Sequence, residues 1–219
     1  MQIFNCLQGS EEWDRLRCRP TASEFGSFIT PARGDYSKQS TAYAAKIVAK
    51  RLGVYTEPPP SFWMEWGSEQ EPNARHAYTK MTGREVQQVG FIMPDHCDDY
   101  GGSPDGLIGD EGILETKCPA PETLIAIHAH GVLPLQYKPQ IQGLLFISGW
   151  QWCDFFVFHP QLKPFMLRVE RDDKYIAKIR LGLETLLPLI ATIESHVSRM
   201  EHELVSMSTT KSEMRFSDE

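Results

Sequence analysis

The sequence predicts an α/β fold, with a central mixed β-sheet flanked by helices and a long C-terminal helix. Helical and strand-like segments follow one another along the chain, turn residues separate them, and an amphipathic stretch runs from about residue 173 to 205. If the helices were segregated from the strands, the class would be α+β. We expect one domain over residues 1–205 and a loose polar tail over residues 206–219.

The composition is typical of a globular protein that does not enter a membrane. The 219 residues are 41% hydrophobic and 23% charged, and no apolar run approaches the roughly 20 residues that span a bilayer. The start, MQIFNCLQGSEEW, lacks the layout of a secretory signal, so we expect a cytoplasmic protein. Five cysteines without a CxxC pair argue against a disulfide framework and against a zinc site. The net charge of −7 is weak evidence against nucleic-acid binding, because an acidic exterior can coexist with a basic groove.

The N-terminal part of the chain predicts short helices. SEEWDRLR is typical of a helix capped by Ser10, and TASEFGSFI of a second helix in which Thr21 and Glu24 form a capping box. PARGDYS is a loop, and residues 40–52 form a third helix.

The segment WGSEQEPNARHAYTKMTG predicts a helix that carries a carboxylate on its apolar face. Four residues share that face, namely Ala74, Ala77, Tyr78 and Met81. Glu71 falls on the same face by its spacing. Pro72 suggests that the regular helix begins there, and Gly83 is a suitable C-cap.

The remaining elements are predicted from apolar runs and turn residues. They are, in order, a strand over 85–93, a hairpin within 103–119, helices over about 121–130 and 138–148, strands over 151–159 and 165–171, and the long helix over about 173–205.

The hairpin sequence SPDGLIGDEGILETKCP contains charged residues that a simple hairpin would not need. GDEG provides the turn, which brings Asp105 close to Glu115 across the ladder. Side chains alternate along a strand, so Glu115 and Lys117 share one face. Two half-buried carboxylates repel each other unless a cation lies between them, and Mg²⁺ is a hard cation that prefers oxygen ligands. The lysine can then hold or deprotonate the attacking water, or neutralise charge on a phosphate.

A structural interpretation competes with this one. Asp105 could belong to a PDG turn, while Glu115 and Lys117 form a surface ion pair on a half-exposed strand. The carboxylate of Glu71 on an apolar helical face favours the metal site. Other conspicuous residues are expected to be structural: His128 and His130 at the surface, Trp63, Trp66, Phe155, Phe156 and Phe158 in the core, and Cys118 as a small buried side chain.

The chain also resembles the phage exonucleases of the YqaJ-type viral recombinase family, in the PD-(D/E)xK nuclease superfamily. The resemblance runs in order through EEWDRLR with TASE, WGSEQEPNAR, SPDGL with LETKCP, QYKPQIQ and VERDDKY, nearly to residue 200. It implies the PD-(D/E)xK nuclease fold.

The resemblance also implies roles for particular residues. Asp105 and Glu115 would bind Mg²⁺, or Mn²⁺ in its place, with the main-chain carbonyl of Thr116, and Glu71 matches the family's helix carboxylate. Lys117 matches the catalytic lysine, and Gln140 matches the glutamine that positions water or phosphate. The terminal 5′-phosphate would be received by Arg17, Ser23 and Ser103, while Arg33 would contact the duplex ahead of the site.

The expected function is Mg²⁺-dependent 5′→3′ exonucleolysis of linear double-stranded DNA, which releases 5′-mononucleotides and leaves a 3′ single strand for recombination. The resemblance further implies a homotrimeric ring, a phage single-strand annealing protein as partner, and a phage or prophage gene expressed in a bacterial cytoplasm. Two alternatives remain. One is a PD-(D/E)xK endonuclease that cuts within DNA, and the other is a non-catalytic DNA-binding protein.

Overall fold

The computed structural model describes the backbone of residues 1–215 and the side chains of residues 1–200. The α-helices in this range are α1 (Glu11–Leu16), α2 (Ser40–Arg51), α3 (Phe62–Thr82), α4 (Pro121–His130), α5 (Lys138–Ser148) and α6 (Asp173–Arg215). Two 3₁₀ helices are η1 (Ala22–Ser27) and η2 (Leu135–Tyr137). The strands are β1 (Gln2–Phe4), β2 (Phe91–Met93), β3 (Gly106–Ile108), β4 (Gly112–Lys117), β5 (Trp152–Val157) and β6 (Phe165–Glu170).

The larger sheet has the strand order β3-β4-β5-β6 and is mixed, as predicted. Strand β4 pairs antiparallel with β3 and parallel with β5, and β6 is antiparallel to β5. The parallel pair requires a crossover, which α4 and α5 provide. Strands β1 and β2 form a separate antiparallel pair. The α/β fold class is therefore confirmed.

The two faces of the larger sheet are covered by different helices. Ile113 and Phe155 pack into the main hydrophobic cluster with Ile141 and Leu144 of α5. The neighbouring residues on the same strands point the other way. Leu114 and Phe156 pack with Ala74 and Tyr78 of α3, a smaller cluster. This alternation places β4, with its charged end, between α3 and α5.

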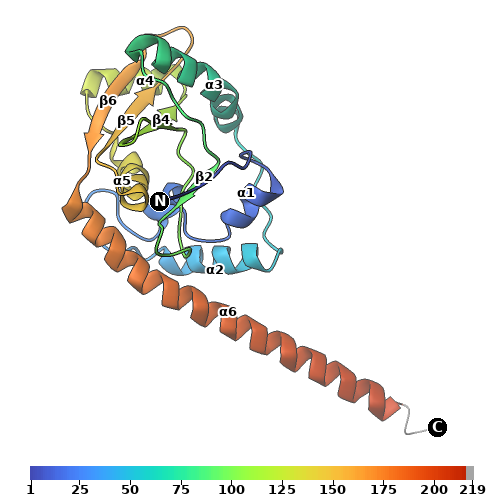
Figure 1. The fold of residues 1–219 in the computed structure, drawn as a ribbon. Helices are drawn as coiled ribbons and strands as arrows, with labels where there is room; N and C mark the ends of the chain where they lie inside the picture. The colour runs from blue at the N-terminus through green and yellow to red at the C-terminus, as the bar shows by residue number, and fades with distance from the viewer. Residues whose placement is uncertain (216–219) are drawn as a thin grey trace.

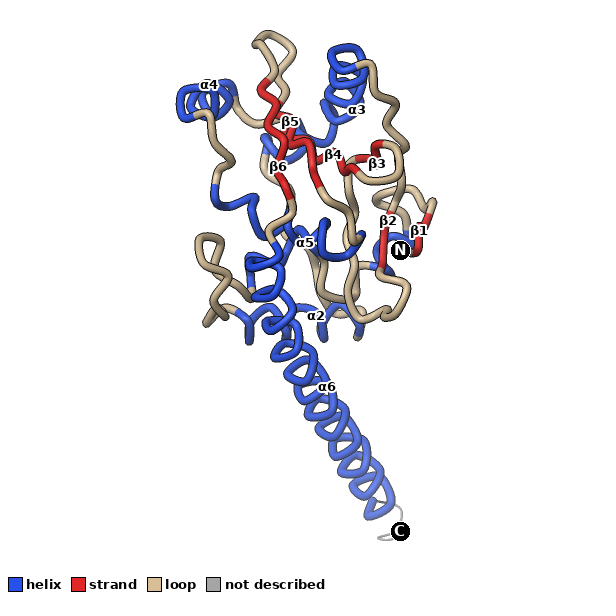
Figure 2. The backbone as a smooth tube through the Cα atoms, turned by 60° about the vertical axis from the view of Figure 1, so that its left-hand side comes forward, coloured by secondary structure: helices blue, strands red, loops and turns tan. Residues whose placement is uncertain are grey.

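Helix α6 closes the fold on the side away from the sheet. Its apolar face, including Ile179 and Leu186, packs with Ile47 and Val48 of α2 in the main cluster. Figure 1 shows α6 running beside α2 and then continuing beyond the body of the protein. Figure 2 places strands β3 to β6 in the half of the molecule opposite the projecting part of α6. No helix within residues 1–215 has the length and hydropathy of a transmembrane span.

Most elements follow the sequence prediction. Ser10 caps α1 by accepting a hydrogen bond from the Trp13 amide at 3.3 Å, and Gly83 caps α3 with a left-handed φ of 69°. The helices over 121–130 and 138–148 and the last two strands lie where they were expected. Cys118, Phe155 and Phe156 are buried.

One predicted helix start and one predicted capping interaction are wrong. Helix α3 begins at Phe62 rather than near Pro72, which lies inside the helix. Proline lacks an N–H and costs stability in a helix interior, so the packing of α3 on the sheet must outweigh that cost. The expected capping box of Thr21 and Glu24 does not form, because Thr21 makes no side-chain cap. Glu24 instead pairs with Lys46 of α2 at 3.1 Å.

Other corrections concern burial and element length. Met81 is 49% exposed and Trp63 is 43% exposed, although both were expected in a buried face or core. Of the strand expected over 85–93, only Phe91–Met93 is a strand, and Gln87 forms an isolated bridge with Leu107. Helix α6 continues to Arg215, so the expected tail is helical up to that residue, and residues 216–219 lie outside the described part.

Candidate active site

The β3–β4 hairpin places Asp105 and Glu115 at one end of the sheet. Gly106 pairs with Leu114, so Asp105, one residue before, lies beside Glu115 as the turn predicted. Gly109 takes a left-handed φ of 57° in the GDEG turn, a conformation that glycine adopts without strain. The sequence places the charged residues at the end of β4 remote from this turn, where β3 no longer covers the strand.

Glu115 is held from two sides by polar groups. Lys117 and Gln140 both donate hydrogen bonds to its Oε1 atom, and the Lys117 distance is 2.5 Å. The Oε2 atom is buried and has no hydrogen-bond partner among the described residues. Burial, and next the negative charge of Asp105, raise the pKa of Glu115 to about 8. Burial disfavours the ammonium of Lys117, but the charges of Glu115 and Asp105 outweigh it and raise its pKa.

A second cluster forms around Asp105. Its Oδ2 atom accepts hydrogen bonds from both the backbone N–H and the side-chain hydroxyl of Thr116, the latter at 2.8 Å. Glu71, on α3, lies 3.4 Å from Arg75 and next to Asp105. Burial, followed by the hydrogen bond and charge of Asp105, raises the pKa of Glu71 to about 8. The sequence prediction that the helix carboxylate meets the hairpin is therefore correct in geometry.

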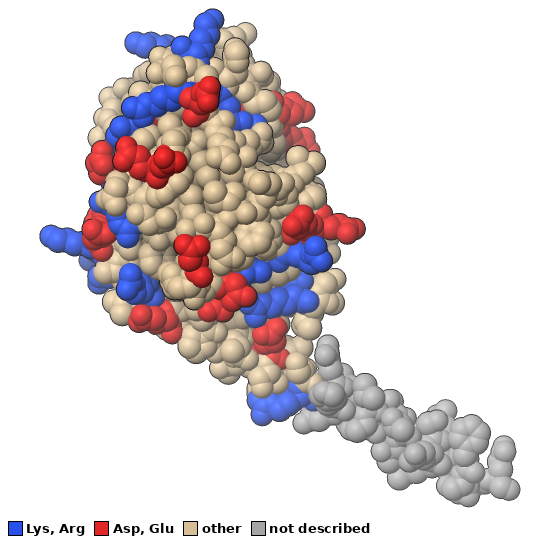
Figure 3. Space-filling view, viewed as in Figure 1, with Lys and Arg blue, Asp and Glu red and all other residues tan. Residues whose placement is uncertain are grey.

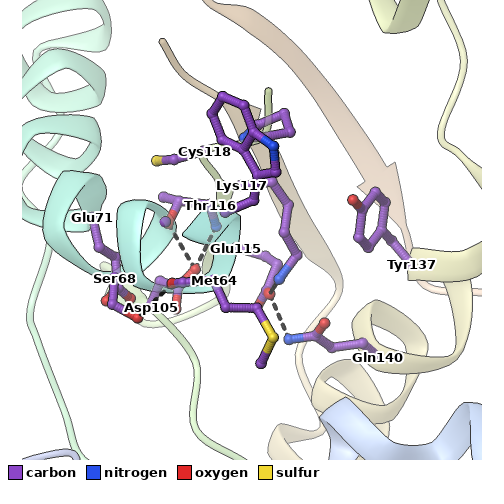
Figure 4. Close-up of a pocket in the computed structure, with 13 residues that line it drawn as sticks. Met64, Ser68, Glu71, Asp105, Glu115, Thr116, Lys117, Cys118, Tyr137 and Gln140 are labelled. Atoms are coloured by element: carbon purple, nitrogen blue, oxygen red, sulfur yellow. Dashed lines mark hydrogen bonds and ion pairs between the residues drawn. The ribbon is translucent and has the colours of Figure 1, made fainter. Parts of the chain in front are cut away.

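The two clusters face one cavity of about 460 Å³. Figure 4 shows Glu71 and Asp105 on one side, with Glu115, Lys117 and Gln140 on the other. Thr116, Ser68, Tyr137, Trp63 and Met64 also line it. Five residues predicted from sequence for catalysis, on β4, α3, α5 and the loop before β3, are thus brought together.

The donor set fits a divalent cation. Among the residues whose side chains are described, no three His, Cys, Asp or Glu side chains are grouped like metal ligands. The expected site combines the carboxylates of Asp105, Glu115 and Glu71, which line one cavity, with the main-chain carbonyl of Thr116. The N–H and C=O of one residue leave a strand at the same edge, so this carbonyl faces the edge where Asp105 lies. A bound cation would give the unpartnered Oε2 of Glu115 a partner and would lower the raised pKa values of Glu71 and Glu115.

Two of the three residues predicted to receive a 5′-phosphate, Arg17 and Ser103, are linked through Trp13. The guanidinium of Arg17 lies 4.3 Å from the centre of the Trp13 ring, and the indole N–H of Trp13 donates to Ser103 at 2.8 Å. The hydroxyl of Ser23 lies 3.3 Å from that of Thr21, and Thr21 lines a small pocket together with Arg17. Burial lowers the pKa of Arg17. None of the three lines the acidic cavity, although Ser103 precedes Asp105 by only two residues.

Arg33 lies apart from these groups. Its side chain is 85% exposed in the loop after η1 and is 3.7 Å from Asp35. On the face shown in Figure 3, basic and acidic side chains are interspersed around an uncharged area, so that face has no region of one sign. Among residues 1–200, Asp35 is the ion-pair partner of Arg33, and the contact of Arg33 with the duplex stays a prediction.

Several residues at the site were missed in the sequence prediction. Trp13 joins Arg17 to Ser103, and its i, i+4 spacing to Arg17 on a helix was the available signal. Tyr137 lines the cavity, and the Lys117 ammonium lies 5.5 Å from its ring centre. Trp63 and Met64 also line the cavity, but nothing in their spacing separates them from core residues.

Comparison with known proteins gives consistent matches. The model of the YqaJ-like viral recombinase domain matches residues 12–151, a range that includes every residue lining the cavity. The chain is similar to an alkaline exonuclease from Laribacter hongkongensis, with 32% identity, a TM-score of 0.80, and coverage of 89% of this chain and 100% of that one. The same exonuclease in complex with dAMP gives a TM-score of 0.79 at the same identity and coverage.

A phage-related exonuclease from Haemophilus somnus has 15% identity, a TM-score of 0.61, and coverage of 83% of this chain and 96% of that one, which shows likeness of fold alone. A search of curated proteins found no match. The family model and the 32% identity over 89% of the chain show that this protein belongs to the family of YqaJ-like viral recombinase domains.

Proposed function

We propose that this protein is a Mg²⁺-dependent exonuclease that degrades linear double-stranded DNA in the 5′→3′ direction. It would release 5′-mononucleotides and leave a 3′ single strand for phage recombination. The observation that carries the proposal is the acidic cavity, in which Glu71, Asp105 and Glu115 meet Lys117 and Gln140. The likeness to an alkaline exonuclease, and the dAMP held by that relative, support a reaction that yields mononucleotides.

Asp105, Glu115, the Thr116 carbonyl and Glu71 would hold the cation. When bound, Mg²⁺ would neutralise charge at the scissile phosphate and make water a better nucleophile. The ammonium of Lys117 would neutralise charge on the phosphate or hold the attacking water. Gln140 orients the Glu115 carboxylate and would position water or phosphate. Arg17, with Ser23 and Ser103, would bind the terminal 5′-phosphate and so set the direction of degradation.

The test uses linear duplexes labelled separately at each end of each strand. With Mg²⁺, the 5′ labels should be released first, as mononucleotides, and Asp105→Ala should release none. Earlier release of the 3′ labels would overturn the proposed direction.

Two further measurements distinguish the exonuclease from an endonuclease and from a non-catalytic DNA-binding protein. Covalently closed circles should stay intact, whereas an endonuclease would cut them. A non-catalytic DNA-binding protein would bind the duplex and hydrolyse neither substrate at any Mg²⁺ concentration.

The family likeness also supports a proposal about assembly. We propose a homotrimeric ring around the DNA and a phage single-strand annealing protein as partner. The mass of the protein in solution, with and without duplex, tests the first part. Co-purification with an annealing protein encoded by the same phage or prophage tests the second.

A further inference from the structure

Helix α3 begins with three consecutive large apolar side chains that are exposed. Phe62, Trp63 and Met64 are 67%, 43% and 64% exposed. Single exposed apolar residues are common on protein surfaces, but a contiguous run is not. Trp63 and Met64 also line the cavity that contains the carboxylates. An apolar wall therefore stands beside the acidic groups of the candidate active site.

Neighbouring aromatic rings hold Trp63 in place. Its ring centre lies 5.0 Å from that of Phe62 and 6.4 Å from that of Trp66, both edge to face, at 77° and 84°. Trp66 in turn lies 5.8 Å from the ring of His159. Edge-to-face pairs of this kind are favourable beyond the area that they bury, which stabilises the observed orientation of the ring. Trp63 is thus a large, partly exposed flat surface supported by two neighbouring rings, so less side-chain entropy is lost when a ligand binds to it.

We propose that Trp63, with Met64 beside it, is the surface on which the base of the terminal nucleotide stacks while its phosphodiester lies at the carboxylates. This inference rests on the proposed function and deepens it. In a nucleotide the base is joined to its phosphate through one sugar. With the phosphate at the carboxylates, the base can therefore reach Trp63, which lines the same cavity. The cavity of about 460 Å³ is of the size that encloses a small ligand. Because every base has a π-face, stacking would accept all four bases.

The test compares linear duplexes whose 5′-terminal nucleotide is normal or abasic. For the wild type, kcat/KM for the normal duplex should be roughly 5- to 150-fold higher than kcat/KM for the abasic duplex. This ratio is the range expected for one base stacked on an aromatic ring. Trp63→Ala should bring the ratio close to one, and Trp63→Phe should retain most of it. Met81→Ala is the matched control, since Met81 is an exposed apolar residue of the same helix that does not line the cavity. It should leave the ratio unchanged.

Three results would overturn the inference. The wild type could show no preference, Trp63→Ala could slow both substrates equally, or the preference could follow an abasic site on the opposite strand. An equal slowing would show that Trp63 affects the rate without contacting the terminal base.

A binding measurement separates this inference from the proposed function. If the wild type degrades no DNA, the proposed function fails. Calorimetry with dAMP and with 2-deoxyribose 5-phosphate would still show whether the protein binds the base. The wild type should bind dAMP more tightly than the sugar phosphate, and Trp63→Ala should bind the two alike. Equal binding by the wild type would remove the base subsite.

Discussion

Lys117 and Gln140 donate hydrogen bonds to the same atom, Oε1 of Glu115. One donor follows Glu115 by two residues on β4, and the other comes from the first turn of α5. Their shared use of Oε1 fixes the carboxylate and leaves Oε2 buried without a partner among the described residues. The arrangement resembles a site prepared for a cation, because leaving a buried carboxylate oxygen unpartnered otherwise costs free energy.

Lys117→Ala should reduce the rate of DNA hydrolysis by roughly 10²-fold or more, because one electrostatic or proton-transfer contribution is lost. Single-turnover rates at saturating Mg²⁺ measure this. Binding of duplex DNA should survive, since the other cavity groups remain. Lys138→Ala is the control, because Lys138 is also a partly buried lysine in an ion pair but lies outside the cavity. Near-normal turnover of Lys117→Ala would mean that Lys117 only forms a structural ion pair with Glu115.

Glu71→Ala should abolish hydrolysis or raise the Mg²⁺ concentration needed for half-maximal activity by about 10-fold or more, because a carboxylate ligand is removed. Titration of activity with Mg²⁺ measures the change. The fold should persist, since Glu71 takes no part in the apolar clusters. Glu69→Ala, an exposed glutamate on the same helix, should titrate like the wild type. An active Glu71→Ala variant with an unchanged titration would mean that Glu71 is not a ligand.

The hairpin was predictable because its determinants are local. The GDEG turn and the alternation of side chains fix the register that sets Asp105 beside Glu115. The meeting of Glu71 with Asp105 was predictable in part, since spacing places Glu71 on the apolar face that packs on the sheet. Fold and catalytic cluster therefore follow from short-range patterns, together with the ordered family blocks.

The errors have long-range causes. Glu24 fits a capping box by spacing, but Lys46 on another helix offers a stronger, charged partner. Pro72 is a good first helical residue, yet α3 extends ten residues upstream to Phe62. Periodicity put Met81 on the apolar face, and amino-acid type assigned Trp63 to the core. Neither shows whether another element covers that part of the helix.

Mg²⁺ should stabilise the protein more at about pH 8.5 than at about pH 6, because the carboxyls that bind it must be ionised. The folded-state pKa values of Glu71 and Glu115 are raised to about 8, above the value near 4.3 of an unfolded glutamate. The stabilisation of the metal-free fold that comes from protonation of Glu71 and Glu115 is therefore fully present below about pH 4. It is lost as the pH rises through about 8. Thermal unfolding with and without Mg²⁺ at both pH values measures the difference.

Two variants make that measurement specific. Glu71→Gln removes one of the two titrating carboxyls. Without metal, the Tm of this variant should therefore fall less than the wild-type Tm when the pH is raised from about 6 to about 8.5. Asp105→Asn should show little Mg²⁺-dependent shift in Tm at either pH. A Mg²⁺ effect of equal size at both pH values would contradict the assignment of these carboxyls to the cation.

Arg17→Ala should remove most of the preference for 5′-phosphorylated over 5′-hydroxyl duplex ends. A guanidinium matches the oxygens of a terminal phosphate, and charge-assisted hydrogen bonds contribute about 1.5–3 kcal/mol, or roughly 10- to 150-fold. Trp13 holds this guanidinium 4.3 Å from its ring centre and also binds Ser103, so the group is oriented before substrate arrives. Cleavage rates of both substrates by both proteins measure the preference. Arg15→Ala should retain this preference, because Arg15 is an exposed arginine of α1, the helix that Arg17 caps. If Arg17→Ala slows both substrates equally, Arg17 stabilises the fold around Trp13 and does not anchor the phosphate.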